Sequence, residues 1–123
     1  MEQKSRDLLR AGGDLTCRFA DDIAVVRLKG RLDLALSNTF LEFLRDDLSQ
    51  EPQKLVLNFD QLQYLSSAGV SLLIRLSSEH QLKIVGPRQE ILGTLETVGI
   101  RSLLEFYPTE KAAVHAFVSH PSE

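Results

Sequence analysis

Hydrophobic residues follow two different periods along this chain, and each period predicts a different kind of element. Short apolar runs, some alternating with polar residues, predict strands at residues 15–19, 23–32, 54–59, 82–86 and 103–107. Only Ala20-Asp21-Asp22, a turn-forming sequence, separates the first two strands, so we expect a hairpin there. The run 54–59 is almost entirely apolar, which is typical of a strand covered on both faces of its sheet.

Apolar residues that recur every three or four positions predict helices between and after these strands. The expected helices cover about residues 36–48, 68–80, 89–98 and 109–117. In the second helix, the apolar arc formed by Val70, Leu73 and Ile74 widens to include Leu72 and Leu76 and exceeds what one sheet face requires. Either this helix is buried on more than one side, or Leu72 and the first turn contact a partner protein.

The order of these elements, β-β-α-β-α-β-α-β-α, predicts an α/β fold with a mixed sheet. Repeated strand–helix–strand units imply parallel pairing with right-handed crossovers. We expect the helices mainly on one side of the sheet and the opening strand at or near an edge. Residues 14–118 are predicted to form a single domain. Residues 1–13, which end in Gly12-Gly13, are predicted to be a flexible N-terminal tail, and residues 119–123 a frayed C-terminus.

Composition narrows the classes of function that the chain can have. It has 123 residues, of which 43% are hydrophobic, and this is ordinary for one globular domain. No apolar run approaches the ~20 residues that span a bilayer, and the single cysteine, Cys17, cannot form an intramolecular disulfide. The formal net charge is −3 with scattered basic residues, and the three histidines have no metal-ligand spacing. We therefore expect a cytoplasmic protein without membrane insertion, direct nucleic acid binding, metal or cofactor.

The segment Ser66-Ser67-Ala68-Gly69 lies where a predicted strand gives way to a predicted helix. The start of a helix has free backbone N–H groups and the positive end of the helix dipole. A serine there can cap the helix, and a phosphate on it is electrostatically favoured. The segment thus predicts either simple capping or a phosphorylation switch. A nucleophile elbow would need a glycine two residues before Ser67, where Leu65 stands, so we do not expect an enzyme.

The segment from Leu57 to Val70 resembles the signature of STAS domains, the family of anti-sigma factor antagonists (anti-anti-sigma factors) and their relatives. That signature is a strand, a short loop, aspartate or serine, serine, a small residue, glycine, and then leucine or valine. Gly30-Arg31-Leu32-Asp33 is similar to the family's Gly-x-Leu-Asp, and residues 95–100 are similar to its Leu-x-x-x-Gly-Leu/Ile. The resemblance covers about residues 14–118 and implies the STAS fold in a binding protein rather than an enzyme.

The resemblance also implies a mechanism and a set of site residues. In the family, an unphosphorylated antagonist binds an anti-sigma factor that is also a serine kinase with an ATP-binding domain, and thereby frees a sigma factor. The kinase phosphorylates the antagonist, which weakens binding, and a phosphatase resets it. Ser67 matches the phosphorylated serine, and Asp33 matches an acid near the site. The implied partner surface consists of Asp33, Ser66, Ser67, Ala68, Gly69, Val70 and Leu72.

One departure from the family pattern leaves alternatives open. Many phosphorylated members have an aspartate where this chain has Ser66, which is then either a second phosphate acceptor or the helix cap. The pair of serines can also serve for capping without phosphorylation. In that case the chain is an accessory subunit of a transport or scaffold assembly, a role that STAS domains also have. Gly69, which lacks a side chain, is expected to let a partner approach the first helical turn closely.

Overall fold

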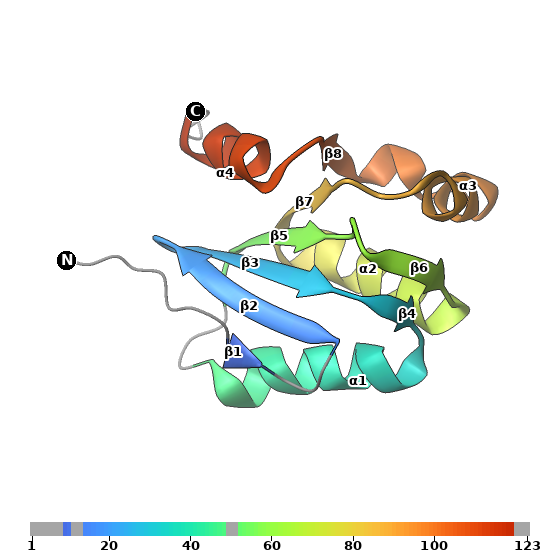
Figure 1. Ribbon diagram of the computed structural model, residues 1–123, viewed down its shortest axis with the longest axis horizontal. Helices are drawn as coiled ribbons and strands as arrows, with labels where there is room; N and C mark the ends of the chain where they lie inside the picture. The colour runs from blue at the N-terminus through green and yellow to red at the C-terminus, as the bar shows by residue number, and fades with distance from the viewer. Residues whose placement is uncertain (1–8, 11–13, 49–51, 120–123) are drawn as a thin grey trace.

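The protein is described by a computed structural model that covers residues 9–10, 14–48 and 52–119. In these ranges a six-stranded sheet has the strand order β1-β2-β3-β5-β7-β8. Its strands are β1 (Leu9–Arg10), β2 (Leu15–Ala20), β3 (Ile23–Leu28), β5 (Lys54–Asn58), β7 (Gln81–Val85) and β8 (Glu105–Tyr107). The first three strands pair antiparallel, and β3, β5, β7 and β8 pair in parallel. The expected mixed sheet is therefore confirmed (Figure 1).

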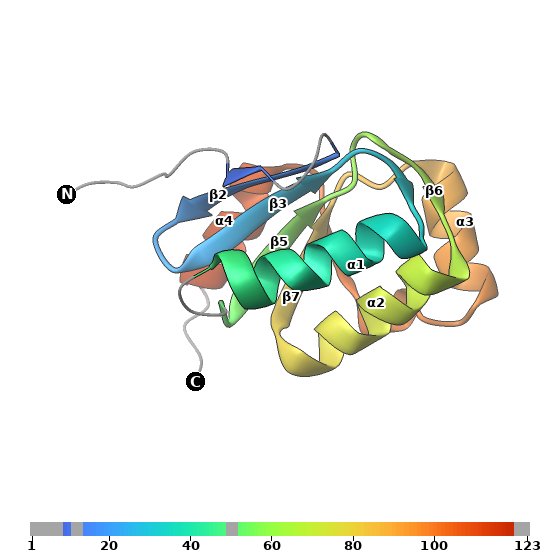
Figure 2. The same ribbon diagram turned by 90° about the horizontal axis from the view of Figure 1, so that it is seen from below.

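The helices lie unevenly on the two faces of this sheet. They are α1 (Leu34–Glu42), α2 (Ser67–Glu79), α3 (Gln89–Thr97) and α4 (Glu110–Ser119). Figure 2 shows α1 and α2 next to each other on one face, whereas α4 lies on the other. Helix α3 packs beside a short strand, β6 (Leu62–Leu65), at one end of the molecule. The structure thus confirms the α/β class with helices mainly on one side.

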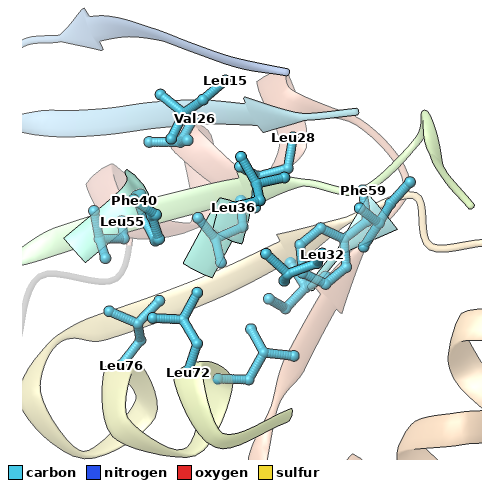
Figure 3. Close-up of a cluster of buried hydrophobic side chains, with 14 of the residues drawn as sticks. Leu15, Val26, Leu28, Leu32, Leu36, Phe40, Leu55, Phe59, Leu72 and Leu76 are labelled. Atoms are coloured by element: carbon cyan, nitrogen blue, oxygen red, sulfur yellow. The ribbon is translucent and has the colours of Figure 1, made fainter. Parts of the chain in front are cut away.

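Two apolar clusters hold these layers together. The larger lies between the sheet and the pair α1 and α2, and it includes Leu55, Phe40 and Leu76 (Figure 3). The smaller joins the opposite face to α4 through Val56 and Phe117. Both faces of β5 are therefore covered, as its nearly continuous apolar sequence predicts.

The predicted strand at 23–32 is two strands in two different sheets. Strand β3 ends at Leu28, and Gly30, with φ of +85°, turns the chain into β4 (Gly30–Leu32). This strand pairs in parallel with β6, which sequence analysis missed. Only Leu62 and Leu65 of β6 are buried, so the strand has no alternating pattern that could reveal it.

Several boundaries also differ from the predicted ones. Leu9–Arg10 pairs with β2 within the segment predicted as a tail, because the backbone groups of an edge strand accept any extended segment. Residues 1–8, 11–13 and 120–123 lie outside the described residues. The last part of the helix predicted at 36–48 is a π-helical turn, Phe43–Asp47. The strand predicted at 103–107 begins only at Glu105, after a 3₁₀ turn.

Candidate functional site

Two helices begin at the same end of the β4–β6 ladder. Leu32 of β4 is paired with Leu65 of β6, and the next residue of each strand caps a helix. Asp33 Oδ1 accepts a hydrogen bond from the backbone N–H of Leu36, with an N···O distance of 3.0 Å. Ser66 Oγ accepts one from the backbone N–H of Gly69 at 3.2 Å. The parallel register therefore places the N-termini of α1 and α2 side by side, and it brings together the two motifs that contain Asp33 and Ser66.

Ser66 has a second bonding role that ties α2 to the end of β4. Its Oγ donates a hydrogen bond to the backbone carbonyl of Leu32 at 2.9 Å, and its backbone N–H donates to the same oxygen at 3.0 Å. The hydroxyl is therefore a donor and an acceptor at once. An ionised aspartate at this position could accept from the helix but could not donate to Leu32. Of the two roles left open for Ser66, the structure shows that of helix cap.

Ser67, in contrast, is exposed and is the first residue of α2. The residue lies at the positive end of the helix, where the backbone N–H groups of the first turn have no partner within the helix. Ala68 is partly exposed, and Val70 packs against the main apolar cluster. Ser66 is only partly exposed and its hydroxyl is bonded on both sides, so Ser67 is the more accessible of the two serines.

Gly69 is buried, and the reason for a glycine differs from the expected one. A Cβ at this position would lie 2.6 Å from the carbonyl oxygen of Leu32 and 2.7 Å from Cδ1 of Leu65. The space of a side chain is thus already occupied by the chain's own β4 and β6. The close approach that requires glycine is internal, and the expectation that it serves a partner is corrected.

Leu72 is also not part of an accessible surface. Only 3% of this residue is exposed, and its side chain points from α2 into the main cluster (Figure 3). Helix α2 contacts both α1 and strand β7, which explains why its apolar arc is wider than one sheet face requires. The prediction that Leu72 binds a partner was wrong, because the helix is buried on two sides.

Three exposed side chains that the sequence did not single out lie within two residues of the caps Asp33 and Ser66. Arg31 of β4 is paired with Tyr64 of β6, and its guanidinium carbon lies 4.1 Å from the centre of the Tyr64 ring. Tyr64 is 44% exposed, and Leu34, the residue after Asp33, is 62% exposed. The sequence offered one sign of this surface, namely that large apolar residues, Tyr64 and Leu34, stand next to the two motifs. Their proximity depends on the pairing of β4 with β6, which the sequence pattern does not reveal.

A separate polar cluster fixes the start of α4 to the other face of the sheet. Glu110 accepts hydrogen bonds from Arg18 at 2.9 Å, Arg27 at 2.7 Å and Asn58 at 2.7 Å. Burial by itself would raise the pKa of Glu110, but the bonds from Arg27, Asn58 and Arg18 lower it from 4.5 to about 2. These partners come from β2, β3 and β5, so one carboxylate joins α4 to three strands.

Across residues 9–10, 14–48 and 52–119, no group of three or more His, Cys, Asp or Glu side chains could hold a metal ion. In the same ranges, no helix has both the length and the apolar character needed to cross a membrane.

Comparison with known proteins places this geometry in a family. The STAS domain model matches residues 14–113. The solved structure of the anti-sigma factor antagonist SpoIIAA in its unphosphorylated form is 17% identical, with a TM-score of 0.72, and the match covers 89% of this chain and 99% of that one. No curated protein sequence matches the chain significantly.

Two further structures have the same fold. The phosphorylated form of SpoIIAA, from Bacillus, is 17% identical with a TM-score of 0.59, and the match covers 83% of this chain and 97% of that one. The STAS domain of a SulP transporter from Vibrio cholerae is 21% identical with a TM-score of 0.66, over 83% of this chain and 85% of that one. The fold is therefore shared by proteins with different tasks.

Proposed function

The chain belongs to the STAS domain family, and from this premise we propose that it is an anti-sigma factor antagonist controlled by phosphorylation of Ser67. Unphosphorylated, it binds an anti-sigma factor that is also a serine kinase with an ATP-binding domain. Phosphorylation by that kinase weakens binding, and a phosphatase restores it. In this scheme the protein acts in the cytoplasm by binding and is not itself an enzyme.

The observation that carries this proposal is the division of roles between the two serines. Ser66 caps α2 and is bonded to Leu32, whereas Ser67 is exposed at the first position of the helix. A kinase can therefore modify Ser67 without breaking the helix cap. The phosphate adds about −1.5 to −2 charges at neutral pH, next to a helix end that favours anions. The switch is thus expected to act on the bound partner rather than on the fold.

The proposed partner surface is smaller than the sequence motif implies. Asp33, Ser67 and Ala68 remain exposed or partly exposed, and Val70 contributes only the part of its side chain that is not packed inside. Gly69 and the capping hydroxyl of Ser66 support this surface from below, because both contact Leu32. Leu72 is excluded by its burial.

The proposal is tested by incubating the protein with its cognate kinase and ATP and locating the phosphate by mass spectrometry. We expect one phosphate, on Ser67, and none in Ser67→Ala. Ser71→Ala is the matched control, since Ser71 is exposed on the same helix one turn later. Full phosphorylation of Ser67→Ala would show that another residue is the acceptor.

A second candidate function is favoured by the similarity to the SulP transporter domain. In that case the chain would be an accessory subunit of a transport or scaffold assembly and would dock without phosphorylation. Purification of the bound partner separates the two candidates. An ATP-binding kinase supports the antagonist, whereas a transporter component that binds Ser67→Ala and wild type equally supports the accessory subunit.

A further inference from the structure

Three exposed side chains, in β4, in β6 and at the start of α1, lie within two residues of the helix caps and have no assigned role. They are Arg31, Leu34 and Tyr64, here called the Arg31 patch. We propose that the Arg31 patch is the docking point for a segment of the partner kinase that presents an acidic side chain beside an apolar one. The inference rests on the proposed function and names the chemistry by which the same partner is recognised.

The patch lies close along the chain to the serine that carries the proposed switch. Arg31 and Tyr64 are paired across the β4–β6 ladder, and the chain reaches Ser67 only three residues after Tyr64. Leu34 is the first residue of α1, as Ser67 is the first residue of α2. A partner that covers Ser67 and the end of the β4–β6 ladder, where both helices begin, can therefore reach these side chains as well.

The side chains of the patch are suited to binding because they are exposed and two of them contact each other. The guanidinium of Arg31 lies above the Tyr64 ring, and this cation–π contact restricts part of the side-chain freedom that binding would otherwise remove. Tyrosine and arginine are also enriched among the residues that dominate binding energies at interfaces. Leu34 adds apolar area without a role in the core, since 62% of it is exposed.

The charge of this surface decides which partner it fits. Arg31 is positive, and each helix N-terminus contributes about half a positive charge, whereas Asp33 is the one carboxylate among residues 31–34 and 64–67. These eight residues and the two helix ends together carry a net charge of about +1, which attracts an acidic side chain. A phosphate on Ser67 adds about −1.5 to −2 and changes the sign of that charge. The same acidic side chain would then be repelled, and Arg31 would be drawn to the phosphate.

The test is the affinity of unphosphorylated variants for the cognate kinase, measured by isothermal titration calorimetry. We expect Arg31→Glu, Tyr64→Ala and Leu34→Ala each to weaken binding at least tenfold. Val118→Ala and Lys111→Glu are the controls, because Val118 is also 62% exposed and both residues lie on α4, across the sheet. The controls should change affinity less than twofold, and circular dichroism should show that all variants are folded.

Each outcome has a separate meaning. If the wild type does not bind the kinase, the proposed function fails and the docking point fails with it. If the wild type binds and the three patch variants bind equally well, only the docking point is overturned. Analytical ultracentrifugation of the free protein tests a second copy as the occupant. A dimer that Arg31→Glu dissociates would assign the patch to self-association and would overturn the proposal.

The contribution of charge to binding can be measured within the same experiment. In wild type, phosphorylation of Ser67 should weaken binding far more than in Arg31→Glu, because that variant has already lost the positive charge. The affinity of wild type should also fall more steeply with added salt than that of Arg31→Glu. Equal salt dependence of the two proteins would contradict an acidic partner segment.

Discussion

The backbone carbonyl of Leu32 accepts two hydrogen bonds from Ser66, one from its backbone N–H at 3.0 Å and one from its hydroxyl at 2.9 Å. These bonds join residues 34 positions apart in the sequence. They fix the start of α2 against the end of β4, and the residue after Leu32 is Asp33, the cap of α1. The relative position of the two helix N-termini therefore depends on Ser66.

Removal of the Ser66 hydroxyl should weaken this junction. Ser66→Ala loses the cap on Gly69 N–H and the donor to Leu32, and we expect the free energy of unfolding to fall by about 0.5–2 kcal/mol. Urea denaturation measures this loss. Ser71→Ala, a substitution of an exposed serine in the same helix, should change stability much less. Equal effects of the two substitutions would contradict the capping role.

Addition of a methyl group at Gly69 should be costly. Gly69→Ala would place Cβ 2.6 Å from a backbone oxygen that cannot rotate away, so we expect a loss of about 1–3 kcal/mol in unfolding free energy. Gly93→Ala is the control, because Gly93 lies in α3 and a Cβ there meets nothing within 4 Å. That variant should gain about 0.5–1 kcal/mol from helix propensity. An unchanged stability of Gly69→Ala would show that α2 can move away from Leu32 of β4 and Leu65 of β6.

The stability of the protein should depend on Glu110 in acid. Its pKa is about 2 in the folded protein and higher in the unfolded chain, so its contribution is complete above about pH 4.5 and is lost as the pH falls towards 2. Fully realised, this lowering of the pKa corresponds to about 3.4 kcal/mol, and screening by solvent reduces the expected contribution to about 2–3 kcal/mol. We expect Glu110→Gln to be less stable than wild type at pH 7, and the difference should shrink between pH 4.5 and 2.

Chemical denaturation at several pH values measures this dependence. Glu79→Gln, at the exposed end of α2, is the control and should leave the pH dependence of stability close to that of wild type. A difference between Glu110→Gln and wild type that stays constant across this range would contradict the role of the ionised carboxylate.

A negative charge at Ser67 should affect binding and spare the fold. Ser67→Asp places a carboxylate at the positive end of α2, where such charges stabilise helices by about 0.3–1 kcal/mol. We expect an unchanged or slightly raised melting temperature. If coupling between the charge and the partner is about 1–3 kcal/mol, affinity for the kinase should fall about 5- to 150-fold. Undiminished binding by Ser67→Asp would remove the proposed switch.

The elements that sequence analysis located correctly are those with long, regular patterns. The apolar run at 54–59 and the stripes of the four helices each repeat often enough to identify the element. The capping role of Ser66 could also be predicted from the sequence, because a serine just before an apolar helical run commonly caps the helix. Strand β6 was missed, since its two buried leucines are separated by two exposed residues.

The functional site was predictable only where it depends on local sequence. Asp33 and Ser66 each cap the helix that follows them, and that relationship is visible within a few residues. The internal reason for Gly69 and the neighbourhood of Arg31 and Tyr64 depend on how β4 pairs with β6. Such pairing is set by long-range packing, which no pattern within one strand specifies.

The alternation of Arg31 and Leu32 along β4 has a consequence for how such a protein diversifies. Leu32 is fully buried and Arg31 is exposed. Selection for stability therefore acts on one position and selection for binding on the adjacent position of the same strand. Changes at outward positions can alter which partner is chosen, while inward positions keep the scaffold intact. A cell with several related antagonists could thus insulate their signalling routes from one another by substitutions at a few outward positions.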